Sequence, residues 1–120
     1  KTHNLGSDTL TVALTNTAPN ATDATLSQIT EIAYTNLSSR ALTASASSQT
    51  SGTYKLVIND LVLTSSGGTT GPFRYVVIYN DTAASDNLVC YFDYASSITL
   101  GDGETLTLNF DGSTGLLTIA

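Results

Sequence analysis

Positive charge is scarce in this 120-residue chain. Four Lys and Arg residues stand against ten Asp and Glu residues, which gives a formal net charge of −6. The four cationic residues are spread along the sequence as Lys1, Arg40, Lys55 and Arg74. Nucleic-acid binding needs a basic face that neutralises phosphates. Four scattered residues cannot build such a face, so we expect no nucleic-acid partner.

Cysteine and histidine are almost absent, with one residue of each, Cys90 and His3. A lone cysteine forms no intrachain disulfide, and a place between Val89 and Tyr91 in a predicted strand suits a small buried hydrophobe. His3 has no second ligand-type residue at metal-binding spacing, and we expect a solvated terminal side chain. Nucleophilic catalysis by Ser or Cys needs a positioned base, and this chain offers no histidine other than His3. We therefore predict no catalytic, cofactor-binding or metal-binding residues and no enzyme activity.

The carboxylates do not change that expectation. Two facing acids can hydrolyse glycosides, but no spacing here predicts a pair at the required separation. The turn 101–104 and the pair Asp111-Gly112 lack the run of oxygen ligands, closed by a downstream acid, that a calcium loop requires. We expect solvated turn acids at Asp81, Asp86, Asp93, Asp102, Glu104 and Asp111.

Long apolar runs are also missing. No stretch approaches the roughly 20 apolar residues of a membrane span, and no signal-peptide pattern opens the chain. We therefore expect no membrane partner. Because the sequence begins with Lys1 and not with Met, we expect it to start after processing or after a removed segment.

Helix-favouring residues are few, whereas Ser and Thr are abundant, as is typical of strands and turns. The length suits one domain, which would bury about two-thirds of its unfolded surface. We predict an all-β, single-domain antiparallel β-sandwich or jelly-roll-like fold of about eight short strands. At most a short helix is expected, near residues 23–33. Residues 1–8 are predicted to form an N-terminal arm and residues 9–120 the β-sandwich domain.

The most strongly patterned segments are residues 71–79 and 88–94, which hold four of the six tyrosines. Dense β-branched and aromatic residues favour strands, and the polar residues 80–87 favour a solvated loop between antiparallel neighbours. Both faces of each strand are largely apolar, which suggests central strands that are covered on both sides. With a period of two, one face of the first strand is expected to carry Phe73, Tyr75, Val77 and Tyr79, and one face of the second Leu88, Cys90, Phe92 and Tyr94.

The remaining strands are weaker or shorter. Residues 9–15 alternate as a half-buried strand with threonines outward, and residues 41–46 suggest an edge strand before a flexible turn over 47–52. Asn59-Asp60 allows either a bulged strand or a turn between two strands. Further strands are expected over 54–58, 61–64, 98–100, 105–110 and 117–119, the last after a loop of hairpin length. The predicted core includes Tyr75, Val77, Val89, Tyr91, Leu106 and Leu108.

Six motifs stand out along the chain: Asn4 to Leu10, Leu14 to Pro19, Ser48 to Leu56, Gly71 to Tyr75, Tyr79 to Thr82 and Gly101 to Thr105. Together they resemble motifs of small virion proteins of tailed bacteriophages. The resemblance covers nearly the whole chain, and family members usually carry additional residues before the His-Asn-Leu-Gly segment. It implies a non-enzymatic structural component of the particle and transfers no catalytic residue.

Members of this family serve in head decoration, as minor capsid proteins, or in tails and fibres. We expect a capsid decoration or cement protein on the capsid exterior, because negative charge is unfavourable next to packaged DNA. Its expected partners are further copies of itself, the major capsid protein and other virion proteins. A homotrimer is the expected oligomer, because capsid lattices offer local threefold sites. The alternative is a tail, baseplate or fibre module that binds host surface glycans.

Overall fold

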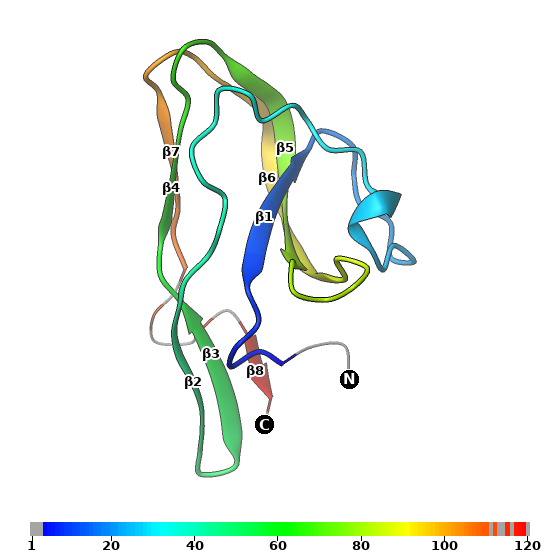
Figure 1. The fold of residues 1–120 in the computed structure, drawn as a ribbon, viewed down its shortest axis with the longest axis vertical. Coiled ribbons are helices and arrows are strands. Elements are labelled where there is room, and N and C mark those ends of the chain that lie inside the picture. The colour runs from blue at the N-terminus through cyan, green and yellow to red at the C-terminus, as the bar shows by residue number, and fades with distance from the viewer. Residues whose placement is uncertain (1–3, 111, 113–114, 116, 120) are drawn as a thin grey trace.

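Eight strands and one helical turn make up the computed structural model, which describes residues 4–110, 112, 115 and 117–119 (Figure 1). All strand pairs are antiparallel, so the predicted all-β fold is confirmed. The elements are β1 (Leu10–Thr15), the 3-10 helix η1 (Leu26–Gln28), β2 (Ala44–Thr50), β3 (Thr53–Ile58), β4 (Leu61–Thr64), β5 (Thr70–Asn80), β6 (Leu88–Leu100), β7 (Thr105–Leu108) and β8 (Leu117–Ile119).

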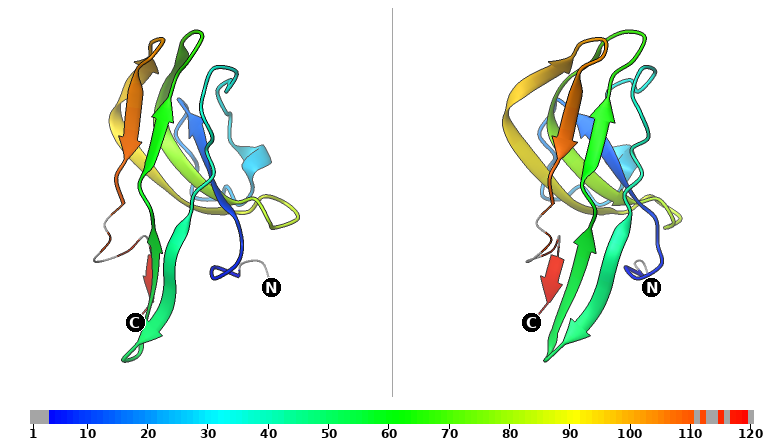
Figure 2. Two further views of the ribbon diagram at one scale, coloured as in Figure 1. Left: turned by 60° about the vertical axis from the view of Figure 1, so that its left-hand side comes forward. Right: turned by 90° about the vertical axis from the view of Figure 1, so that its left-hand side faces the viewer.

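The strands form two layers. One layer is the sheet β1-β5-β6, and the other contains the pair β4-β7 and the sheet β2-β3-β8. Figures 1 and 2 show that β4 continues the line of β3 and that β8 lies below β7. The second layer is therefore long, and its β2–β3 hairpin projects beyond the first layer. The molecule measures 47 × 28 × 25 Å as a result.

The main core lies between the two layers. Alternate residues of β1 point inward and pack against side chains from three other strands. These side chains are Leu56 and Ile58 of β3, Leu63 of β4, and Val76 and Ile78 of β5. A smaller apolar cluster lies on the outer face of the first sheet, where Ala13, Val77 and Tyr79 pack against η1 and its neighbours. The complete main cluster is Leu10, Val12, Leu14, Leu42, Leu56, Ile58, Leu63, Phe73, Val76, Ile78 and Leu100.

β1 is buried along its whole length, whereas its alternating sequence predicted outward, exposed threonines. The difference arises because residues 31–42 run along the outer edge of β1 without forming a strand (Figure 1). Three backbone hydrogen bonds fix this segment: Ile32 N donates to Leu14 O, Arg40 O accepts from Val12 N, and Leu42 N donates to Leu10 O.

Tyr34 and Arg40 complete this covering. The Tyr34 hydroxyl accepts a hydrogen bond from Leu14 N over 2.9 Å and donates to Glu31 Oε1 over 2.7 Å. Burial raises the pKa of this hydroxyl above its usual range, so it stays protonated at neutral pH. The Arg40 guanidinium lies 3.7 Å from the centre of the Tyr34 ring and donates to Val12 O. The outward backbone groups of β1 are thus satisfied by side chains as well as by the backbone.

The predicted strand pair 71–79 and 88–94 exists as β5 and β6, but only β5 is central. β6 is an edge strand, so its prediction as a strand covered on both sides is wrong. Of the predicted core residues, Val77 is buried as expected. The prediction that Tyr91 is buried is wrong, since its side chain is 49% exposed. The other four residues, Tyr75, Val89, Leu106 and Leu108, are partly buried.

The predicted faces of β5 are also partly wrong. Phe73 belongs to the main core together with Val76 and Ile78, and not to the face of Val77 and Tyr79. The pairing register shifts on both sides of Phe73, so the simple period of two does not continue through it.

The weaker predictions had mixed outcomes. The helix near residues 23–33 is the single turn η1, capped by Thr25. Residues 47–50 belong to β2 and not to a turn, and the strand predicted over 41–46 begins only at Ala44. Asn59 and Asp60 separate two strands that pair with different partners. β7 and β8 do not pair with each other; the hairpin-length loop between them lies partly outside the described residues.

The N-terminal residues that the structure describes are folded back on themselves. Asn4 N donates to the Asp8 carboxylate, and Asp8 also accepts a hydrogen bond from the Asn80 side chain. Leu5 packs against the main core. The division into an arm over 1–8 and a domain over 9–120 stays a prediction.

We expect Tyr34→Phe to destabilise the protein by about 1–2 kcal/mol, because it leaves the amide of the fully buried Leu14 without its acceptor. Tyr54→Phe is the matched control, since among the described residues its hydroxyl bonds only to the exposed Ser47 side chain. That control should change stability by less than about 0.5 kcal/mol. Urea unfolding of both variants measures the difference. Equal costs would contradict the role given to Tyr34.

Candidate functional site: an open apolar groove beside a free strand edge

The two long sides of the sandwich differ in whether a segment of the chain bridges the two layers. On one side, residues 31–42 bridge the two layers, because they cover β1 and also bind β4. Ser38 N donates to Thr64 O of β4, and Ser66 N, which follows β4, donates to Asn36 O. On the other side, β6 of the first layer and β7 of the second face each other without pairing. Among the described residues, no segment lies between these two strands as 31–42 does between β1 and β4. The core is therefore open on the β6–β7 side.

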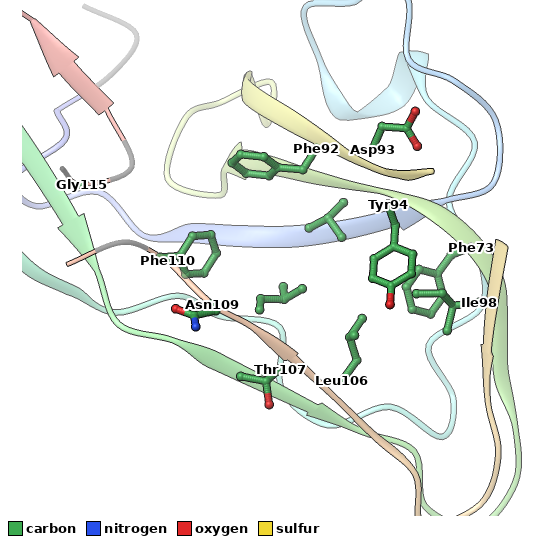
Figure 3. A pocket seen from close by; sticks show the side chains of 12 residues that line it. Phe73, Phe92, Asp93, Tyr94, Ile98, Leu106, Thr107, Asn109, Phe110 and Gly115 are labelled. Carbon is green, nitrogen blue, oxygen red and sulfur yellow. The ribbon is translucent and has the colours of Figure 1, made fainter. Parts of the chain in front are cut away.

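A cavity of about 410 Å³ occupies this opening, and we call it the open groove. β5 and β6 form one wall, and β7 with the residues that follow it forms the other (Figure 3). The Phe92 ring meets the Phe110 ring across it, with centroids 6.5 Å apart. The lining residues are Phe73, Val76, Phe92, Asp93, Tyr94, Ile98, Leu106, Thr107, Leu108, Asn109, Phe110 and Gly115.

The interior of the open groove is mainly apolar. Figure 3 shows the rings of Phe92, Tyr94 and Phe110 around the cavity, whereas the side chains of Asp93 and Thr107 point away from it. Ligand sites for sugars or cofactors need a few polar groups that converge on the ligand. The open groove lacks that convergence among the residues described, so its chemistry suits an apolar surface of another molecule.

β6 exposes large side chains on both of its faces beside the open groove. Tyr91 is 49% exposed on the outer face, while Phe92 and Tyr94 are 46% and 57% exposed on the groove side. Only one other large hydrophobic side chain among the described residues is comparably exposed, Val62 on β4. Large apolar side chains that are exposed close together are typical of interaction sites.

In the described part of the chain, no strand lies beside the outer edge of β6. Segment 24–26 covers its beginning, where Leu26 N donates to Asp86 O and Leu88 N donates to Ala24 O. Beyond Leu88, no described residue forms a backbone hydrogen bond to this edge. An unpaired, hydrophobic edge strand is a ready template for pairing with another chain.

A buckle interrupts β6 at Tyr94–Ser97. Asp93 pairs with Tyr75 of β5 and Ile98 pairs with Phe73, so four residues of β6 face one residue of β5. Ala95 within the buckle has a φ of 71°, a left-handed conformation that is uncommon for a residue other than glycine. The Ser97 hydroxyl donates to the side chain of Asn16 and fixes the buckle against the end of β1.

Asp93 and Arg74 hold the start of the buckle. Asp93 Oδ1 accepts hydrogen bonds from Arg74 Nε and from Ala95 N, both over 2.7 Å, and Oδ2 accepts from Arg74 Nη2 over 3.0 Å. The Arg74 guanidinium, together with the Ala95 amide, lowers the pKa of the Asp93 carboxyl. Asp93 is the single charged residue of β6, and Arg74 neutralises its charge in this exposed pair.

Cys90 lies on β6, partly buried against the main core. Burial raises the pKa of its thiol to about 11, so the thiol is protonated at neutral pH. His3 and Asp111 lie outside the described residues. No other His is present in the sequence, so the structure brings no imidazole to Cys90 from the residues it describes.

The remaining acids lie in separate loops. Asp81 and Asp86 belong to the β5–β6 loop, while Asp102 accepts from Gly67 N and Glu104 from Gly101 N near the β6–β7 turn. No group of three His, Cys, Asp or Glu that could hold a metal occurs in the part of the chain that the structure describes. The described residues also include no helix with the length and apolarity needed to cross a membrane.

The open groove itself was not predicted from the sequence. The available signal was the density of aromatic residues in 73–94, but that pattern fits a covered strand as well as an exposed one. Which side of the core stays open depends on where residues 31–42 lie, and their sequence has no regular period.

Ala95→Gly is expected to stabilise the protein by about 0.5–1 kcal/mol, because glycine adopts a positive φ without steric cost. The matched control is Ala46→Gly in β2, an exposed residue without positive φ, which should lose about 0.5–1 kcal/mol. Thermal unfolding measures both. Destabilisation by both glycines would contradict the left-handed buckle.

The Arg74–Asp93 pair predicts a pH dependence. Since its folded pKa is lowered, Asp93 contributes stability above its unfolded pKa of about 4, and this contribution is lost as pH falls through the folded value. Asp93→Asn should therefore be less stable than the parent at pH 6 and equally stable near pH 2. High salt should reduce the pH 6 difference, because the pair is exposed. If the stability difference between Asp93→Asn and the parent did not change with pH, the stabilising role of the Arg74–Asp93 pair would be contradicted.

Comparisons with family models, with curated proteins and with solved structures gave no match to this chain. The resemblance to phage virion proteins therefore stays a prediction, and the site is interpreted from its own geometry.

Proposed function

We propose that this chain is a non-enzymatic structural protein of a bacteriophage particle, a capsid decoration or cement protein that stabilises the shell through contacts between subunits. The observation that carries the proposal is the open groove beside the free edge of β6. In the isolated chain this surface leaves Phe92 and Tyr94 half exposed. Such a surface suits a protein that functions within an assembly, where neighbouring subunits cover it.

The charge distribution supports the same proposal. The chain is poor in charge, with 12% charged residues, and β2 has no charged residue although all of it is exposed. Interface cores are depleted in charge relative to the rest of a protein surface. A net charge of −6 suits the outside of a shell, away from packaged DNA.

A glycan-binding module of the tail, baseplate or fibre is the alternative. The exposed Tyr94 ring could stack on a sugar, but the polar side chains of Asp93 and Thr107 point away from the open groove (Figure 3). A glycan would therefore find few hydrogen-bonding groups there. The groove geometry favours an apolar protein surface as its occupant.

Cryo-electron density of a particle that carries this chain tests the proposal. We expect copies on the outer surface of the shell, at local threefold positions, with the open groove against protein. Copies confined to the tail or wound along a fibre would overturn the decoration role. Adherence of the purified protein to host cells would favour the glycan-binding alternative.

A binding assay with shells that lack this protein gives a second test. Adding the purified protein should raise the temperature at which the shells disrupt. Tyr94→Asp should weaken shell binding at least about tenfold, because it places a charge in the groove contact. Val62→Asp is the control, since Val62 is 50% exposed but lies outside the groove lining. Equal effects of both variants would contradict a role for the groove.

A further inference from the structure

We propose that β6 pairs edge to edge with β6 of a second copy of this chain, antiparallel about a two-fold axis at Tyr91. The pair would join two three-stranded sheets into one sheet of order β1-β5-β6-β6-β5-β1. This inference deepens the proposed function and rests on its self-association, since it names the surface through which two copies meet. In a shell with copies at threefold positions, this contact would link neighbouring positions.

The free part of the β6 edge has defined limits. At its start, segment 24–26 occupies the edge up to Leu88 through the hydrogen bond from Leu88 N to Ala24 O. At its end, the buckle begins directly after Asp93. The stretch available for pairing is therefore 89–93, and its central residue is Tyr91. In an antiparallel pair of identical stretches, the central residue lies opposite itself.

Natural edge strands carry features that prevent such pairing, and this stretch has few of them. It contains no proline and no lysine. Its one charge, Asp93, is neutralised by Arg74 of the same chain. Although each copy carries a net charge of −6, two copies can approach along this edge without like charges meeting at the contact.

The exposed rings favour a second copy over a partner that covers one face. Tyr91 lies on one face of β6, whereas Phe92 and Tyr94 lie on the other, so only a partner aligned with the edge covers all three. A buried aromatic side chain covers about 150–250 Å², so three half-exposed rings offer roughly 300 Å² per copy. That is more than a third of the roughly 800 Å² that each partner buries in a standard interface.

Disulfide trapping of the purified chain tests the pairing. In a Cys90→Ser background, Tyr91→Cys should form a disulfide-linked dimer, because opposed residues of an antiparallel pair lie about 4.5–5.5 Å apart at Cα. Ser96→Cys in the buckle and Ser48→Cys on β2 are equally accessible controls, since both residues are exposed. We expect at least about tenfold faster linkage at position 91 than at either control.

A second pair of variants tests the same contact without a cross-link. Tyr91→Lys places two like charges at the axis and should raise the dimer dissociation constant about a hundredfold, as measured by sedimentation. Val62→Lys is the matched control, since Val62 is as exposed as Tyr91 but lies on β4, and it should leave dimerisation unchanged. Circular dichroism of both variants should show the strand content of the parent.

Each of the following results would overturn the inference: a monomeric parent, equal linkage at positions 91 and 48, or self-association unchanged by Tyr91→Lys. Linkage between copies carrying Tyr91→Cys and copies carrying Ser48→Cys would instead indicate a head-to-tail contact between β6 and β2, and would also overturn it. A different result would refute the proposed function. A protein that dimerises through β6 but does not bind shells would refute the decoration role alone.

Discussion

The constraint on which this structure depends is that every backbone group at the edge of a sheet needs a hydrogen-bond partner or water. β1 meets this constraint through residues 31–42, which bind its outward groups and also reach β4 in the other layer. That single irregular segment closes one long side of the sandwich. β6 has no corresponding segment among the described residues, so its edge and the core behind it face solvent.

On the open side, specific residues also fix the path of β6. Arg74 and Asp93 fix the point at which β6 departs from β5, and the left-handed Ala95 turns the chain outward. Tyr94 and Ile98 consequently reach the open groove from both ends of the buckle. A conformation that costs of order 1 kcal/mol persists only where its surroundings fix it, and such strain is common at functional positions.

The same surface connects the fold to the proposed assembly. A core that is open on one side makes an isolated chain less stable. In an assembly the same opening favours association, because a neighbouring subunit can complete the burial of apolar surface. The low charge of the β6 edge removes the repulsion that a net charge of −6 would otherwise impose. Aromatic side chains then supply most of the apolar area that a partner can cover.

The sequence by itself determined the fold class, because strand composition and alternation are local properties. Segments such as 9–15 and 105–110 alternate polar and apolar residues with a period of two that only a sheet accommodates. Composition also determined the scarcity of basic and imidazole groups, which limits the available chemistry. Only the tertiary structure decided that Tyr91 is exposed and Thr15 is buried. The reason is that exposure depends on which segment lies next to a strand, and the irregular residues 31–42 and the buckle at 94–97 have no periodic signal that would reveal their positions.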